Sequence, residues 1–164
     1  MTVLAQPTRV LYFGSREWID VPARWTIREV HTHVRRHGAV PLKGPRYIAI
    51  GRQMQADIAE HGQLVVIEGE ADGADILSRI IAGNLGQDVE RFPVDRALDG
   101  PWPAAGPQRN ARMDREGRPV LARGFVVGLR GTPLSRGSAG MLDILQRRGC
   151  PVIVHRDDGV EVPS

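Results

Sequence analysis

The sequence predicts an α/β fold of the Rossmann-like kind, in which helices cover both faces of an open, mostly parallel sheet. Five short apolar runs alternate along the chain with stretches of helical periodicity. Continuous apolar runs separated by helices are typical of parallel strands that are buried on both faces. The length of 164 residues fits one domain with a sizeable core. We therefore expect residues 1–164 to form a single domain.

The expected strands are the apolar runs at residues 9–13, 64–67, 89–94, 124–128 and 151–155. The first run is rich in residues that favour strands, and it stops at Gly14. The second, Leu-Val-Val-Ile, is the clearest buried strand, whereas the third is interrupted by Pro93. Right-handed crossovers between such strands bring their carboxyl ends to one edge of the sheet.

The expected helices are the periodic stretches at residues 26–36, 74–85, 109–116 and 139–148. Apolar residues in these stretches recur at helical spacing, except in the short polar stretch at 109–116. Residues 39–62 do not fit the repeat, and we interpret them as an insertion with an extra strand at 47–50 and a helix at 53–61. We expect residues 157–164 to form a loosely ordered tail.

The charge pattern disfavours a dedicated nucleic-acid binder. The 22 basic residues comprise 21 arginines and Lys43, and the net charge is only +3. The arginines are scattered among acids, and no long basic run occurs. Arginine still has a planar guanidinium that holds a phosphate through two hydrogen bonds.

The sequence also predicts a cytoplasmic location. Cys150 is the only cysteine, so no internal disulfide can form, which favours a reducing compartment and a structural role for this residue. No run of about 18 apolar residues is present, so no membrane span is expected. Residues 1–7 contain no basic region followed by an apolar stretch, so we expect no signal peptide.

The loops after the strands are the most informative part of the sequence, because ligands of open α/β sheets bind outside the carboxyl ends of the strands. The loop after the first strand begins Gly14-Ser15-Arg16. Glycine permits a tight turn, serine offers a hydroxyl and a loop amide, and arginine offers a fork for phosphate. A plain turn followed by a surface arginine is the alternative reading.

The loop after the second strand favours a helix start and a ligand site about equally. Asp72 could cap the next helix, with Asp75 three residues on in a capping-box relation. Gly69 gives the backbone room, and the helix start favours an anion. Glu68 and Glu70 are poor neighbours for a phosphate, so they either accept hydrogen bonds from ribose hydroxyls or lie apart from the anion.

The loop after the third strand offers an aromatic ring and two polar side chains. Trp102 lies between two prolines and could stack on a base. Arg109 and Asn110 follow in the first turn of the next expected helix. An arginine at a helix start is placed against the dipole, which indicates another reason for its position.

The loop after the fourth strand is the best anion cradle in the chain. Gly137, Ser138 and Ala139 combine free amides, a hydroxyl and a helix start. The loop has no Gly-Lys-Ser/Thr, so triphosphate hydrolysis of the Walker kind is not expected. The first loop lacks the Gly-x-Gly-x-x-Gly pattern of dinucleotide dehydrogenases.

No metal and no cofactor other than a nucleotide ligand are expected. His33 and His37 are four residues apart on the first expected helix, a spacing that can hold zinc. No cysteine or clear carboxylate partner accompanies them.

Together these loops resemble the SLOG superfamily, named for the Smf/DprA and Lonely Guy proteins, and within it the YspA-like family of bacterial and phage proteins. The resemblance rests on Gly-Ser-Arg at 14–16, Gly-Glu-Ala-Asp-Gly-Ala-Asp at 69–75, Ala-Gly-Pro-Gln-Arg-Asn-Ala-Arg-Met at 105–113, and Gly-Ser-Ala-Gly-Met at 137–141 leading to Gly-Cys-Pro-Val at 149–152. It covers nearly the whole chain except the insertion and the tail.

The resemblance implies a Rossmann-like fold that binds nucleotides or nucleotide-derived ligands. Its Lonely Guy branch implies cleavage of the N-glycosidic bond of a nucleoside monophosphate by an arginine in an Arg-x-x-x-Met stretch and a glutamate in Gly-Gly-x-Gly-Thr-x-x-Glu. Arg109 and Met113 fit the first motif. Gly137 and Ser138 stand in place of Gly-Thr in the second, and Met141 occupies the position of the glutamate.

Three functions follow as hypotheses. The first is a binding module, a sensor or carrier for a nucleotide or ADP-ribose-like ligand. The second is a nucleoside-monophosphate phosphoribohydrolase that uses Arg109 and an acid such as Glu70. The third, single-stranded DNA binding as in the DprA branch, is disfavoured by the mild charge and few aromatic residues. Relatives of this kind commonly form dimers, and a homodimer could use the helix expected at 26–36.

Overall fold

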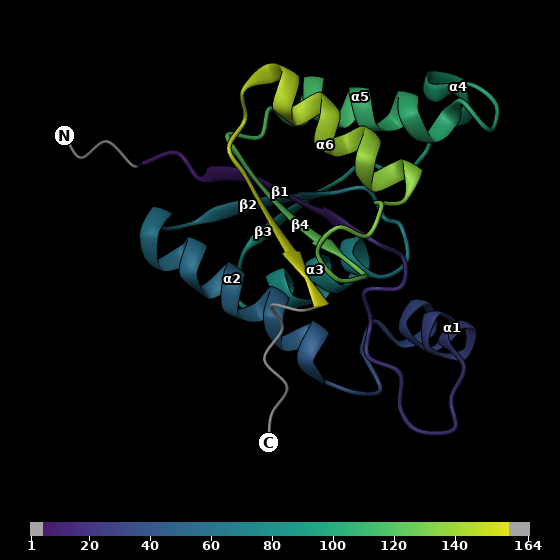
Figure 1. Ribbon diagram of the computed structural model, residues 1–164. Helices are drawn as coiled ribbons and strands as arrows, with labels where there is room; N and C mark the ends of the chain where they lie inside the picture. Colours follow the sequence, from purple (N-terminus) through teal and green to yellow (C-terminus); the bar gives the residue numbers. More distant parts are fainter. Residues whose placement is uncertain (1–4, 158–164) are drawn as a thin grey trace.

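A five-stranded, all-parallel sheet forms the centre of the protein, as seen in a computed structural model that describes residues 5–157 (Figure 1). The strands are β1 (Thr8–Gly14), β2 (Leu64–Glu68), β3 (Asp88–Arg91), β4 (Leu121–Val126) and β5 (Val152–Arg156). Their order in the sheet is β3-β2-β1-β4-β5. The order reverses between β1 and β4, and such a switch point is where open α/β sheets place ligands.

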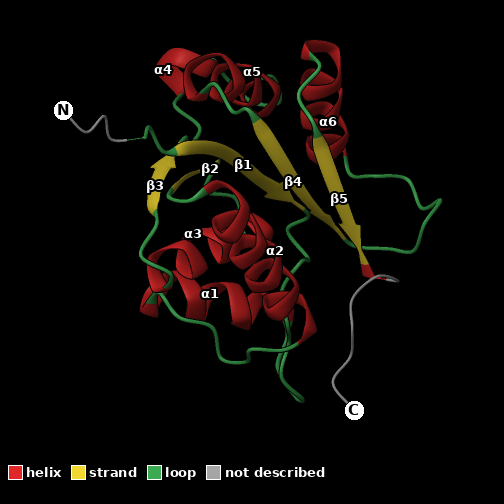
Figure 2. Ribbon diagram, turned by 90° about the vertical axis from the view of Figure 1, so that its left-hand side faces the viewer, coloured by secondary structure: helices red, strands yellow, loops and turns green. Residues whose placement is uncertain are grey.

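Helices cover both faces of this sheet. They are α1 (Ile27–His37), α2 (Pro45–His61), α3 (Ala74–Asn84), α4 (Arg96–Asp99), α5 (Ala105–Gly117) and α6 (Arg136–Arg148). Figure 2 shows α4, α5 and α6 on one side of the sheet and α1, α2 and α3 on the other. The Rossmann-like α/β fold predicted from the sequence is confirmed.

The core has one apolar cluster on each face of the sheet, because successive residues of a strand point to opposite faces. Val10 and Tyr12 of β1 belong to the cluster beneath α1–α3. Leu11 and Phe13 of the same strand belong to the cluster beneath α5 and α6. All four side chains are buried.

A buried polar network attaches α2 to the sheet. The Tyr12 hydroxyl donates to Asp57 Oδ2 at 2.5 Å, and the Arg123 guanidinium donates to both Asp57 oxygens, with Nη2 2.8 Å from Oδ1. Gln53 also donates to Asp57, and its amide oxygen lies 2.8 Å from a ring nitrogen of His155. The network therefore joins α2 to β1, β4 and β5.

Several element boundaries differ from the sequence prediction. The extra strand expected at 47–50 is wrong, because these residues form part of α2, in which Pro45 is the first helical residue. The third strand covers only Asp88–Arg91 and not the full run 89–94. The fourth strand begins at Leu121, and α4 is an element that the sequence pattern did not indicate. The expected tail, apart from Asp157, lies outside the described residues.

In the part of the chain that the structure describes, every helix is too short or too polar to cross a membrane.

Candidate functional site

A cavity of about 760 Å³ lies at the carboxyl edge of the sheet, beside the switch point. Its walls come from the loop after β1, the start of α3, the segment 102–107, α5 and the start of α6. We call this cavity the edge pocket. All four loops singled out in the sequence contribute to it, and the second loop contributes Ala71 and Asp75.

Three helix N-termini border the edge pocket. Ala71 and Asp75 line it at the start of α3, residues 103, 104, 106 and 107 at the start of α5, and residues 135–138 at the start of α6. The first amides of a helix have no partner within the helix, and the helix dipole makes this end partly positive. The arrangement favours a negatively charged group in the pocket.

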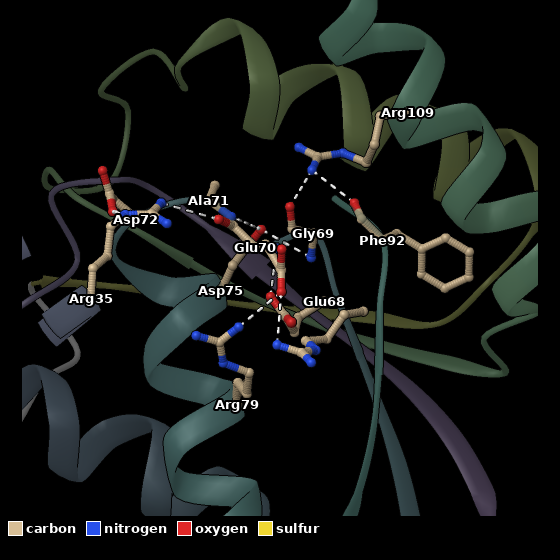
Figure 3. A network of polar contacts seen from close by, with 11 residues as sticks. Arg35, Glu68, Gly69, Glu70, Ala71, Asp72, Asp75, Arg79, Phe92 and Arg109 are labelled. Carbon is tan, nitrogen blue, oxygen red and sulfur yellow. Dashed lines mark hydrogen bonds and ion pairs between the residues drawn. The ribbon is translucent and has the colours of Figure 1, made fainter. Parts of the chain in front are cut away.

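Three arginines add positive charge to the edge pocket, and they differ in how they are held. Arg109 donates through Nη1 to the carbonyl oxygens of Gly69 and Phe92, the latter at 3.1 Å (Figure 3). Arg16 and Arg136 are exposed and make no hydrogen bond or ion pair with any residue in the described range 5–157. They are therefore free to contact a ligand, whereas the guanidinium of Arg109 is already anchored.

Two glycines allow the loops around the edge pocket to approach closely. A Cβ on Gly69 would lie 2.6 Å from Nη1 of Arg109. A Cβ on Gly73 would lie 2.4 Å from the carbonyl oxygens of Ser15 and Arg16, and Gly73 has a φ of +81°. Glycine is thus required at position 73 for the loops after β1 and β2 to pack against each other. A Cβ at position 69 would instead displace the end of the Arg109 side chain.

The start of α6 contains an unsatisfied hydroxyl. Ser135 is the N-cap, and its side chain accepts a hydrogen bond from the amide of Ser138 at 3.4 Å. Ser138 lines the edge pocket and is only 4% exposed, yet within the described residues its Oγ has no hydrogen-bond partner. Nearby, the side chain of Asn110 donates to the carbonyl of Gly137 at 3.4 Å. Buried hydroxyls normally have partners, so this one fits a group supplied by a ligand.

The remaining wall of the edge pocket is apolar. Phe13, Met113, Met141 and Ile144 line it between α5 and α6. Trp102 also lines it, remains 53% exposed, and has its ring 3.4 Å from where a Cβ on Gly106 would lie. The pocket therefore has a cationic rim and an apolar interior with an aromatic ring.

Two buried acids lie at or behind the wall of the edge pocket. Asp75 lines the pocket, is 5% exposed, and accepts hydrogen bonds through Oδ2 from the amides of Gly69 and Ala71 at 3.2 and 3.3 Å. Burial raises the pKa of Asp75 to about 6, although the charges of Arg109 and Arg16 oppose this rise.

Glu68 is completely buried at the end of β2. Its Oε2 accepts a hydrogen bond from the amide of Glu70 at 2.5 Å, and its Oε1 has no partner within residues 5–157. Burial, reinforced by the nearby charge of Asp75, raises the pKa of Glu68 to about 8. Glu68 therefore lies apart from an anion in the pocket, one of the two alternatives that the sequence leaves open.

Several residues predicted for the site lie outside the wall of the edge pocket. Glu70 forms ion pairs with Arg79 and Arg91, and Asp72 forms one with Arg35 at 2.7 Å. The predicted capping box is wrong, because Gly73 is the N-cap of α3 and no side chain caps this helix. Figure 3 shows Asp75 directed toward Gly69 and Ala71, whose amides donate to its Oδ2.

Ser15 and Ala139 form hydrogen bonds with backbone groups around the edge pocket. The Ser15 hydroxyl accepts a hydrogen bond from the amide of Val127 at 3.0 Å, and the Ser15 amide donates to Phe125 at 2.9 Å, so this residue ties β1 to β4. The Ala139 amide donates to the carbonyl of Ser135 within α6. Neither residue lines the pocket, whereas Gly14, Arg16, Asn110 and Gly137 do.

Sequence reasoning missed Arg136 and Glu17 as pocket residues. Arg136 directly precedes the predicted Gly137-Ser138 cradle, so its position was the available signal. The rings of the histidine pair expected to hold no metal, His33 and His37, contact each other at a tilt of 52°, with their centroids 4.6 Å apart. Across residues 5–157 no three potential metal ligands gather.

Known protein families, curated proteins and solved structures give no match to this chain.

Proposed function

We propose that the edge pocket binds a nucleotide or a nucleotide-derived ligand such as ADP-ribose. The observation that carries this proposal is the meeting of three helix N-termini with two arginines that have no partner in the described chain, Arg16 and Arg136, in one cavity at the switch point. A protein that only senses or carries its ligand needs no more than such a binding site.

The phosphate lies at the start of α6 in this proposal. The amides of the first helical turn, the guanidinium of Arg136 and the unsatisfied Oγ of Ser138 supply the donors. Arg16 contacts the phosphate from the facing loop. Arg109, held by two carbonyl oxygens, shapes the wall and contributes its charge.

The base lies in the apolar part of the pocket. Trp102 offers a ring for stacking, and Met113 and Met141 offer polarizable apolar contacts. An apolar cavity with a few convergent polar groups is the usual form of a small-molecule site.

Calorimetric titration with ADP-ribose and with nucleoside mono- and diphosphates tests the proposal. We expect binding to the native chain and a loss of affinity of about tenfold or more in Arg136→Ala, because a hydrogen bond to a charged group contributes about 1.5–3 kcal/mol. Arg115→Ala, at an exposed position on α5 outside the pocket, is the matched control and should bind normally. No heat of binding with any of these compounds would contradict the proposal.

Tryptophan fluorescence tests the placement of the base. Trp18 is completely buried, and Trp25 lines a separate surface hollow, so stacking on Trp102 should quench part of the emission. The quenching should disappear in Trp102→Phe and persist in Trp25→Phe. Quenching that survives the loss of Trp102 would place the base elsewhere.

N-glycosidic hydrolysis of a nucleoside monophosphate is a second candidate, favoured by one observation. Met141 occupies the position of the family glutamate, but Asp75 places a carboxyl in the wall of the same pocket. A carboxylate there would stabilise positive charge on the sugar in the transition state. Chromatography should then detect free base released by the native chain and none released by Asp75→Asn; intact nucleotide after prolonged incubation would exclude this activity.

A homodimer stays a prediction, and the charge of α1 bears on where its interface would lie. Arg28 and Arg36 of α1, with Arg24 before it, form no ion pair with any described residue. Two copies joined face to face through α1 would bring these like charges together, so we place any interface between copies away from α1.

A further inference from the structure

Asp75 is the one buried carboxylate in the described wall of the edge pocket, whereas Glu17, the other acid there, is exposed. It belongs to the first turn of α3 and is 5% exposed. Its Oδ2 is used by the amides of Gly69 and Ala71. Its Oδ1 has no donor within residues 5–157, and Asp75 forms no ion pair there.

A carboxylate in this place offers an acceptor to a ligand. It repels a phosphate, so it does not belong to the phosphate end of the site. The positive charges of Arg109 and Arg16 favour the ionised form of Asp75, yet neither guanidinium is within ion-pair distance of it. Oδ1 of Asp75 is open to the edge pocket, unlike the buried Oγ of Ser138 and Oε1 of Glu68, so a ligand hydroxyl can donate to it in place of water.

The position of Asp75 relative to the other parts of the site indicates which ligand group it meets. The phosphate donors lie at the start of α6, and the base surface is Trp102 with the apolar wall of α5 and α6. The sugar connects these two groups in a nucleotide. Asp75 contributes a hydrogen-bond acceptor from the opposite element, α3, where Figure 3 shows it close to Gly69 and below Arg109.

We propose that Oδ1 of Asp75 accepts a hydrogen bond from a ribose hydroxyl, so that the edge pocket selects ribonucleotides over their deoxy counterparts. The inference rests on the proposed nucleotide binding and assigns Asp75 as the residue that contacts the sugar. Carboxylates hold ribose hydroxyls in dinucleotide-binding Rossmann folds. Asp75 differs from those acids in its place, because it lies in the first turn of α3.

The test is a calorimetric comparison of the adenosine, guanosine, cytidine and uridine diphosphates with their 2′-deoxy and 3′-deoxy forms. We expect the best-bound ribonucleotide to lose about tenfold or more of its affinity when the hydroxyl that meets Asp75 is removed, as is typical of a hydrogen bond to a charged group. The analogue that loses affinity identifies the hydroxyl. Equal affinities for all three sugars would overturn the inference and leave nucleotide binding intact, whereas no binding of any diphosphate would overturn the proposed function itself.

A variant pair links the selectivity to Asp75. Asp75→Asn replaces the charged acceptor and should reduce the ribose-to-deoxyribose preference to near unity, mainly by weakening the ribonucleotide. Asp72→Asn, in the same loop but paired with Arg35 outside the pocket, should keep the full preference. If Asp75→Asn binds with unchanged preference, the inference is wrong. The comparison of sugars on the native chain decides the matter even if this variant fails to fold.

Discussion

At the scale of single residues, Gly73 shows why the loops after β1 and β2 can form one site. A Cβ there would lie 2.4 Å from two carbonyl oxygens, and the φ of +81° is unfavourable for other residues. Gly86 has a similar φ of +71° but no atom within 4 Å of an added Cβ. Comparing the same substitution at Gly73 and Gly86 therefore distinguishes the cost of backbone strain from the cost of steric overlap.

We predict that Gly86→Ala costs about 1–2 kcal/mol of unfolding free energy, from backbone strain alone. Gly73→Ala should cost about 1–3 kcal/mol more, because the added carbon overlaps the loop 15–16. Urea denaturation of both variants measures the difference. Equal losses would mean that the two loops do not pack as closely as described.

Glu68 is the residue whose ionisation should dominate the pH dependence of stability. Its pKa is about 8 in the folded chain, because of burial and the charge of Asp75, compared with an ordinary value of 4.5. Between these two values the folded chain keeps a proton that the unfolded chain has released. Stability should therefore fall as pH rises through this window, by up to about 1.4 kcal/mol per pH unit.

Replacing the carboxyl of Glu68 should remove this pH dependence of stability. We predict that Glu68→Gln flattens the fall in unfolding free energy between pH 6 and 8 and is more stable than the native chain at pH 8. Asp75, with a pKa of about 6, accounts for part of the slope below pH 6. Asp88→Asn, at an exposed carboxyl that forms no ion pair with any residue in the range 5–157, is the control and should leave the profile unchanged. Parallel profiles for the native chain and Glu68→Gln would contradict this assignment.

The residue types in the loops correctly predicted some of the residues that line the pocket, but they did not predict the role of others. Gly14, Arg16, Arg109, Asn110 and Ser138 do line one pocket, as their positions after the strands indicated. Ser15 and Asp72 have the same residue types as ligand groups but are used by a backbone amide and by Arg35. Spacing along the chain does not show which partner a side chain meets across 30 or more residues, so these roles required the structure.

At the scale of elements, α2 is held by a charged residue rather than by apolar packing alone. Asp57 is 1% exposed and is satisfied by Tyr12, Arg123 and Gln53. The insertion predicted at 39–62 thus contains α2, one of the three helices that cover this face of the sheet, and is not an appendage. Its residues 47–50 resembled a strand because four consecutive apolar-leaning residues also fit one helical turn, and a run this short does not distinguish the two.

We predict that Asp57→Ala destabilises the chain by about 3–5 kcal/mol, because it leaves the Arg123 guanidinium buried without a partner. The double variant Asp57→Leu with Arg123→Met removes both charges and should lose clearly less than the single variant. Chemical denaturation monitored by circular dichroism measures both. A double variant as unstable as the single one would mean that the ion pair itself, and not the orphaned charge, stabilises this region.

At the scale of the whole molecule, the strand order creates the site. The sequence predicted parallel strands and a common loop edge, and both are confirmed. It did not predict that β1 and β4 are neighbours, because apolar runs do not encode which strand pairs with which. That pairing separates the helices that follow β1 and β4 onto different faces and opens the edge pocket between them.

The most direct test of nucleotide binding is a crystal structure of the chain grown with ADP-ribose or with its best-bound nucleoside diphosphate. We predict a phosphate within hydrogen-bonding distance of the first amides of α6 and of Arg136, with the base against Trp102. A nucleotide bound outside the edge pocket, or bound there with its phosphates against Met113 and Met141, would contradict the account.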